Sequence, residues 1–80
     1  MDNLGRAYAN QGKLDDASAS FREALRNNPG HVDSWLNLGR AQALKGNRDA
    51  AVAAFRAALH LQPFNAEAKE QLRRLGVPDP

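Results

Sequence analysis

The ionisable and nucleophilic side chains of this 80-residue chain offer little for catalysis. The two histidines, His31 and His60, fall in a turn before one predicted helix and near the end of another, where no nucleophile is expected beside them. The sequence has no glycine-rich phosphate loop, no HExxH and no paired metal ligands at helical spacing. It also lacks cysteine, which excludes disulfides and thiolate metal sites. We therefore predict no enzymatic activity, no metal and no cofactor.

Three arginines recur at a fixed interval along the chain. Arg6, Arg40 and Arg74 stand 34 residues apart. If they are aligned in space, their guanidinium groups suit acidic side chains or a terminal carboxylate, which arginine binds through two parallel hydrogen bonds. A second interpretation stays open. Asp2 and Glu70 lie four residues before Arg6 and Arg74, so these arginines could form ordinary ion pairs along a helix.

The same interval of 34 residues relates two stretches of the whole sequence. Residues 4–29 align with residues 38–63, and 14 of these 26 positions carry the same residue, so the similarity is an internal repeat. Apolar residues within each unit recur at helical spacing in two runs, which Gly12 or Gly46 separates and Pro29 or Pro63 ends. The pattern predicts an all-α chain of five helices, over residues 2–11, 15–28, 32–45, 49–61 and 66–75.

Local signals support the helix ends and the contacts between helices. Asn65 is of the type that caps a helix N-terminus, and Gly76 is of the type that ends a helix. Gly39 and Ala58 are small where two helices must approach closely, and Phe55 would fill the space beside them.

This arrangement resembles the tetratricopeptide repeat, a helix–turn–helix unit of 34 residues. The signature residues of the second unit are Trp35, Leu38, Gly39, Ala51, Phe55, Ala58 and Pro63, and those of the first are Leu4, Gly5, Tyr8, Ala17, Phe21, Ala24 and Pro29. Gln42 stands where the family has Tyr, and Met1 where it has Trp. The resemblance implies one domain of antiparallel helix–turn–helix repeats, stacked as a short right-handed α-solenoid. Repeat one would span 1–31 with a truncated first helix, repeat two 32–65, a capping helix 66–76 and a tail 77–80.

The resemblance also implies a function, which is protein binding in a concave groove lined by the first helix of each repeat. The residues at lining positions are Asp2, Asn3, Arg6, Asn10, Asp33, Leu36, Asn37, Arg40, Leu44, Glu67, Glu70, Gln71 and Arg74. Leu36 and Leu44 are apolar on a face where solvent favours polar residues, so either could receive an apolar anchor of the partner. The alternative is that one of them packs against the neighbouring helix.

The partner expected from these residues is a protein or peptide with acidic groups or an apolar anchor. Members of the family that bind chaperones hold a terminal carboxylate in a clamp of lysine and asparagine. Only Asn37 matches that clamp here, because Asp2 and Arg6 stand at the positions expected on the first helix and Glu67 and Gln71 at those on the last. The sequence therefore argues against a chaperone carboxylate as the ligand.

A second hypothesis is that the chain is an assembly element. The first helix is short and has no preceding helix to pack on, and arrays of this kind normally need about three repeats and polar end caps. The open N-terminal edge could therefore pair with another copy in a homo-oligomer, with domain swapping as a variant. Alternatively, the chain is a fragment of a longer array.

Composition excludes several other classes of function. The net charge is +2, and the 11 basic and 9 acidic residues are interleaved, so we predict no nucleic-acid interface. No apolar run approaches the roughly 20 residues that span a bilayer. The absence of cysteine and of a signal peptide favours the cytoplasm.

Overall fold

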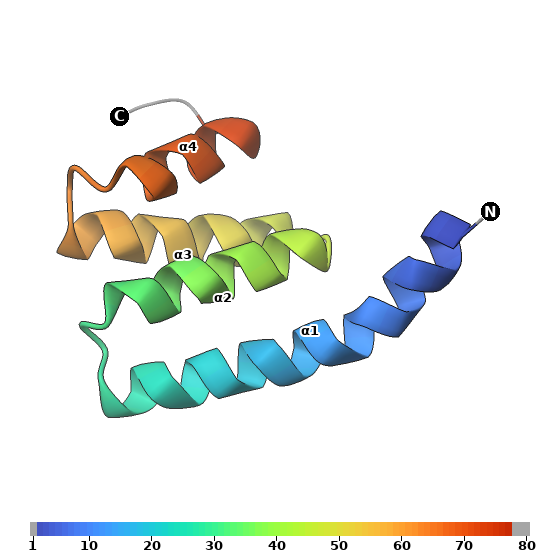
Figure 1. Cartoon of the computed structure of the whole chain (residues 1–80). Helices are drawn as coiled ribbons and strands as arrows, with labels where there is room; N and C mark the ends of the chain where they lie inside the picture. Colours follow the sequence, from blue (N-terminus) through green and yellow to red (C-terminus); the bar gives the residue numbers. More distant parts are fainter. Residues whose placement is uncertain (1, 78–80) are drawn as a thin grey trace.

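The computed structural model describes the backbone of residues 2–77 and the side chains of residues 12–77. Within this range the chain forms four helices and no strand, which confirms the all-α prediction. The helices are α1 (Asp2–Asn27), α2 (Val32–Leu44), α3 (Arg48–Leu61) and α4 (Ala66–Arg74). Each helix packs on the next one in the sequence, so the chain runs back and forth (Figure 1).

The turns between helices are held by hydrogen bonds. The indole Nε1 of Trp35 donates to the carbonyl oxygen of Pro29 at 2.9 Å and fastens the start of α2 to the turn before it. Asn65 accepts a hydrogen bond from the backbone N–H of Ala68 at 2.8 Å, so the predicted cap of the last helix is confirmed. Gly76 follows α4 with a φ of 86°, a conformation that favours glycine, and its predicted role at the helix end is also confirmed.

The main core lies where α2, α3 and α4 meet. Phe55, Ala58 and Ala68 are fully buried there, and Leu72 of α4 is 6% exposed. A smaller cluster joins Leu25 of α1 to α2 and α3. The core explains the small residues of the repeat, because a bulkier side chain at Ala58 or Ala68 has no space to enter.

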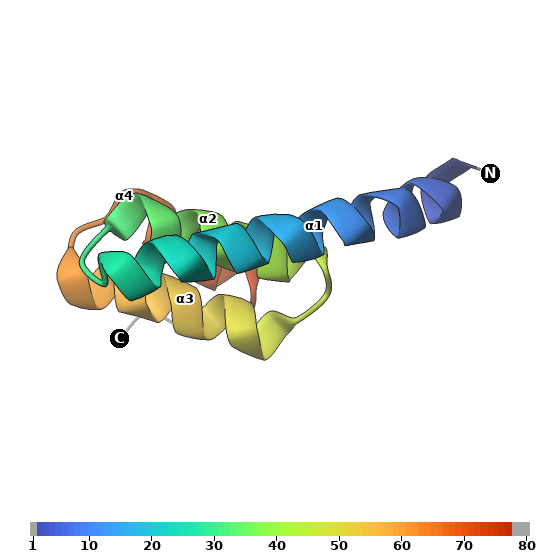
Figure 2. The ribbon, with the colours of Figure 1, turned by 90° about the horizontal axis from the view of Figure 1, so that it is seen from below.

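The prediction of five helices is wrong in the first unit. Residues 2–11 and 15–28 were expected to form a hairpin with a turn at Gly12, but α1 runs through Gly12 without a break. Gly46, the matching residue of the second unit, has a φ of 86° and ends α2 as predicted. The part of α1 before Gly12 therefore continues past the end of the helices beside it (Figures 1 and 2).

Residues that differ between the two units explain why only the second one turns. Asn47 donates from Nδ2 to Oε1 of Gln42 at 2.9 Å, and its backbone N–H donates to the carbonyl oxygen of Gln42 at the same distance. The matching residues of the first unit are Lys13 and Tyr8, which cannot form this amide pair. Lysine also has a higher helix propensity than asparagine, which favours turns.

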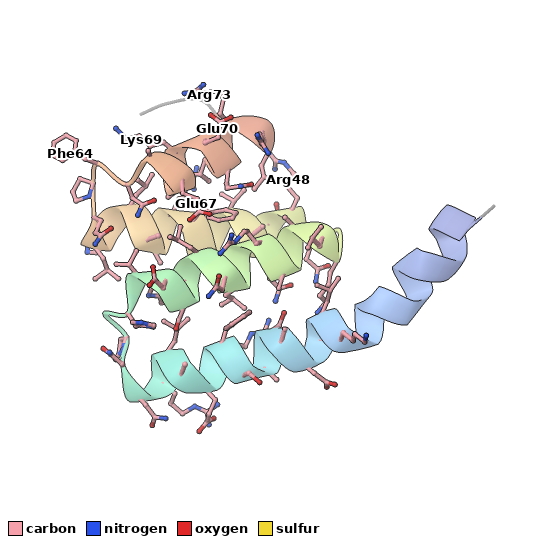
Figure 3. All side chains as sticks on the ribbon, in the orientation of Figure 1. Arg48, Phe64, Glu67, Lys69, Glu70 and Arg73 are labelled. Atoms are coloured by element: carbon pink, nitrogen blue, oxygen red, sulfur yellow. The ribbon has the colours of Figure 1, made fainter. Side chains whose placement is uncertain are left out.

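A longer-range contact further stabilises the second turn. Arg48 donates from Nε to the carbonyl oxygen of Leu75, at the end of α4, at 2.8 Å. Figure 3 shows Arg48 beside that end of the molecule. Leu14 stands at the matching position of the first unit and has no comparable donor. The right-handed sense of the solenoid stays a prediction.

None of the described helices is both long enough and apolar enough to cross a lipid bilayer.

Candidate binding surface

The α2–α4 surface contains a shallow hollow of about 200 Å³, lined by Arg40, Ala43, Leu44 and Gln71. Leu44 is 74% exposed, so its apolar side chain is open to a contact at the edge of this hollow. Arg40, Leu44 and Gln71 belong to the predicted groove. The structure thus brings together predicted residues of α2 with a predicted residue of α4, which is 27 positions further along the chain than Leu44.

Arg40 is positioned at this hollow by two side chains. Its Nη1 lies 3.2 Å from Oε1 of Glu67, an ion pair that joins α2 to α4. Its Nη2 donates to Oδ1 of Asn37, one turn earlier on α2. The side chains of Arg40 and Glu67 remain 48% and 40% exposed, so both charges are in contact with solvent. Since such exposed pairs contribute little net stability, Glu67 can be displaced from Arg40 by a ligand carboxylate at small cost.

Leu36 does not belong to the exposed surface, and its assignment to the groove is corrected. It is only 5% exposed and lies in the main core with Ala68 and Leu72 of α4. Leu36 therefore packs against the neighbouring helix, which is the alternative that the sequence left open, while Leu44 does not. The cluster that buries Leu36 combines residues of α3 and α4, and local periodicity does not specify such contacts between helices.

The remaining predicted residues of α4 form their own ion pairs. Nε of Arg74 lies 3.3 Å from Oε1 of Glu70, and Nη1 of Arg73 lies 3.4 Å from Oε2 of the same carboxylate. Glu70 is therefore shared by two arginines on the surface of α4, where Figure 3 shows it beside Arg73. The interpretation of the arginine row as ordinary helical pairing holds for Arg74.

The predicted groove residues of the first unit are not brought to α2. Asp2, Asn3, Arg6 and Asn10 lie in the part of α1 that continues past the end of α2, because α1 does not turn at Gly12 (Figure 2). Their side chains, and the predicted pair of Asp2 with Arg6, lie outside the described residues, as does Met1. The surface is consequently formed by α2 and α4 alone. Asp33, at the start of α2, is exposed.

Three positions of a carboxylate clamp, residues 37, 67 and 71, fall among the described side chains. Asn37, which matches the clamp, is engaged by Arg40. Glu67 places a negative charge on the side of α4 from which the clamp would donate. The expectation that a chaperone carboxylate is not the ligand stays a prediction.

The two histidines lie far apart in the chain and in different settings. His31 precedes α2, with Nδ1 2.5 Å from Oγ of Ser34, and His60 is exposed in the last turn of α3, where a basic side chain is favourable. No group of three or more histidine, aspartate or glutamate side chains gathers as a metal site among the described residues.

A larger hollow of about 470 Å³ lies at the turn between α2 and α3. Its lining comes from residues 46–50 alone, a single segment of the chain. Because no second element contributes to it, this hollow offers a ligand contact on one side only.

Two features of this surface were not predicted from the sequence. One is Ala43 as a lining residue of the hollow, and the other is an ion pair next to Leu44. Ala43 lies three positions after Arg40, so helical spacing from Arg40 would have found it. Lys45, next to Leu44, forms an ion pair with Asp15 of α1 at 2.5 Å between Nζ and Oδ1. Asp15 is the first residue of the predicted helix over residues 15–28, and no local signal indicates that it contacts Lys45.

A family model described as tetratricopeptide repeat matches residues 3–75. A comparison with curated proteins finds none that matches the chain.

Proposed function

The chain belongs to the tetratricopeptide repeat family, whose repeats generally mediate protein–protein interactions, and we propose that its α2–α4 surface binds an extended peptide or a segment of a partner protein. The observation that carries the proposal is the position of Leu44, which is 74% exposed and lines a hollow beside Arg40. Arginine is enriched among the residues that dominate protein interfaces, and Leu44 offers apolar surface beside Arg40.

The size of the hollow supports a peptide over a small molecule. Its volume of about 200 Å³ is below the roughly 300–1,000 Å³ of pockets that enclose small ligands. A hollow of this size can receive part of a ligand, such as one apolar side chain, while the rest lies along the surface. We infer no catalysis at this surface, since its polar groups are the already paired Arg40 and Glu67 and the amide of Gln71.

The charges on the surface indicate the chemistry of the partner. An apolar side chain would rest on Leu44 and Ala43, and an acidic group near it would take over the guanidinium of Arg40 from Glu67. The released carboxylate of Glu67 would then face solvent or a basic group of the partner. We therefore propose a partner in which one acidic residue stands close to one large apolar residue.

The organisation of the chain is also a proposal. We infer that α2 and α3 form one complete repeat over residues 32–65, that α1 contributes an incomplete one over residues 1–31, and that α4 caps the stack within residues 66–76. The capping role is supported by the two sides of α4. Ala68 and Leu72 are buried, and Arg73 and Arg74 are exposed.

The test is selection from a random peptide library displayed on phage, with the whole chain immobilised. Enriched peptides should share an acidic residue near a large apolar one. Binding of the best synthetic peptide, followed by calorimetry, should weaken at least about tenfold in Leu44→Asp and in Arg40→Ala. No enrichment, or equal affinity of wild type and Leu44→Asp, would sink the proposal.

The chain supplies a matched control for the Leu44 variant. Phe64 is 89% exposed in the turn between α3 and α4, outside the hollow, and Figure 3 shows its ring pointing away from the helices. Phe64→Asp removes more exposed apolar surface than Leu44→Asp and adds the same charge. Peptide affinity in Phe64→Asp should therefore equal that of wild type.

A further inference from the structure

The face of α1 around Phe21 is less covered than its counterpart on α3. Ala51, Phe55 and Ala58 of α3 are each 0% exposed. The residues of α1 that match them in the repeat are Ala17, Phe21 and Ala24, of which the first two are half-buried and the third is exposed. The two faces carry the same residues, so the difference comes from what lies against them.

The α2–α3 hairpin shows which segment fits such a face. A Cβ atom on Gly39 would lie 2.7 Å from Cζ of Phe55, so the backbone of α2 sits directly on the phenyl ring. The matching residue of the first unit is Gly5, in the same Leu-Gly-Arg-Ala sequence that surrounds Gly39. Residues 2–11 therefore have the sequence that covers a face of this kind, but α1 does not turn at Gly12 and holds them away from its own Phe21.

We propose that two copies of the chain exchange these segments, so that residues 2–11 of each copy cover the face of α1 around Phe21 on the other. In the exchanged dimer, residues 2–11 gain a face to pack on and the face of α1 around Phe21 gains a segment that covers it, because each copy supplies the segment that the other lacks. It requires no change in α1, which stays one helix from Asp2 to Asn27.

The repeat fixes how the two α1 helices would meet. Gly39 lies against Phe55 in the hairpin, and transferring that pairing by 34 positions sets Gly5 of one copy against Phe21 of the other. One helical turn along each antiparallel helix from that contact, position 43 comes opposite position 51, and this register transfers in the same way to Ala9 with Ala17. The two helices then run antiparallel and cross near Lys13, and the contact is the same from both sides, as a two-fold dimer requires.

Self-complementarity favours a second copy over an unrelated partner. An unrelated helix would need the glycine, alanine and leucine spacing that residues 2–11 already have. The interface differs from the α2–α4 surface, so the two proposals are tested separately.

The absence of cysteine makes disulfide trapping a clean test. Two single variants, Ala9→Cys and Ala17→Cys, are mixed, exchanged under reducing conditions and then oxidised, and their products are separated by mass. The expected product is a disulfide that joins one chain of each variant. Ala19→Cys replaces Ala17→Cys as the control, since Ala19 is exposed and lies on the other side of α1; its yield with Ala9→Cys should be at background.

The double variant Ala9→Cys/Ala17→Cys distinguishes exchange from folding back within one chain. Exchange gives a covalent dimer with two disulfides. A monomer with an internal disulfide means that residues 2–11 fold onto their own α1, and it would overturn the proposal. Absence of both products, or a mixed yield equal to that of the Ala19→Cys control, would overturn it as well.

Sedimentation over a wide concentration range gives an independent readout. Wild type should show a monomer–dimer equilibrium, and Gly5→Leu should raise its dissociation constant at least about tenfold because the new side chain meets Phe21. Gly12→Ala should keep the dimer, since alanine favours the unbroken helix and disfavours the positive φ that a turn needs there. Wild type that stays monomeric at every concentration contradicts the proposal.

Discussion

Gly39 and Phe55 meet where α2 packs on α3, with the backbone of α2 resting on the phenyl ring of α3. A Cβ atom at position 39 would lie 2.7 Å from Cζ and 2.8 Å from Cε1 of Phe55. Phe55 is itself 0% exposed. The ring has no free volume to move into, so this contact sets how closely α2 and α3 approach.

Gly39→Ala should therefore destabilise the chain although alanine is the better helix former. We expect a loss of roughly 1–3 kcal/mol in the free energy of unfolding, the usual cost of overpacking a core. Gly12→Ala is the matched control, because a Cβ atom there would meet nothing within 4 Å. It should stabilise the chain by roughly 0.5–1 kcal/mol. Urea unfolding followed by circular dichroism measures both, and equal effects of the two variants would contradict the packing argument.

Removing the buried hydroxyl of Ser18 should raise the stability of the chain. Ser18 is 1% exposed, and its Oγ has no hydrogen-bond partner among the described residues. Ser18→Ala removes a buried polar group whose desolvation is uncompensated. We expect the free energy of unfolding to rise by about 1 kcal/mol more than in Ser20→Ala, an exposed control on the same helix with the same gain in helix propensity. A destabilised Ser18→Ala would show that the hydroxyl is satisfied.

The stability that the N-cap of α4 contributes should depend on a hydrogen-bond acceptor at position 65, whether an amide or a carboxylate carries it. Asn65→Ala removes the oxygen that accepts from the N–H of Ala68 and should cost about 1 kcal/mol. Asn65→Asp keeps that oxygen and adds a negative charge at a helix N-terminus, which is favourable. The thermal unfolding temperature of Asn65→Asp should therefore equal or exceed that of wild type, and both should exceed that of Asn65→Ala. Equal destabilisation of Asn65→Asp and Asn65→Ala would contradict the role of the acceptor at position 65 in capping α4.

The ion pair of Arg40 with Glu67 should contribute little to stability. Both side chains are more than a third exposed, and exposed pairs typically contribute below about 1 kcal/mol. A double-mutant cycle with Arg40→Ala and Glu67→Ala should give a coupling energy in that range, reduced further by added salt. This outcome is also what makes Arg40→Ala usable in the binding experiment. A coupling energy well above this limit would mean that the pair holds α4 in place and is not free to exchange partners.

The turn at Gly46 should be transferable to Gly12. Tyr8→Gln together with Lys13→Asn gives the first unit the two amide side chains that pair at the second turn. We expect this double variant to lose helix at positions 12 and 13, because the amide pair stabilises a chain reversal there. Backbone chemical shifts in NMR would show the break directly, and wild type gives the comparison. An unbroken α1 in the double variant would assign the turn to the contact of Arg48 with Leu75 instead.

The sequence by itself determined the features that depend on local spacing. Repeated apolar positions, glycine and proline predicted α2, α3 and α4 to within one residue at each end, and the cap at Asn65 followed from residue type alone. It also placed Arg40 and Leu44 on one face of α2, because helical periodicity fixes which side chains share a face. The resemblance to the repeat family added Gln71 to that surface. The family assignment rests on the same spacings, now matched over residues 3–75.

Only the tertiary structure decided the features that depend on contacts between distant residues. Gly12 and Gly46 stand at matching positions of the repeat, yet one lies inside a helix and the other ends one. The local amide pair of Asn47 with Gln42 contributes to this difference, and so does the contact of Arg48 with the carbonyl of Leu75, 27 positions away, which only the tertiary structure shows. Leu36 and Leu44 likewise lie on the same helix, and only Leu36 is buried in the core that α3 and α4 complete. A local pattern sets the helical conformation and its apolar face, whereas packing energy between helices selects which turns form and which apolar side chains stay exposed.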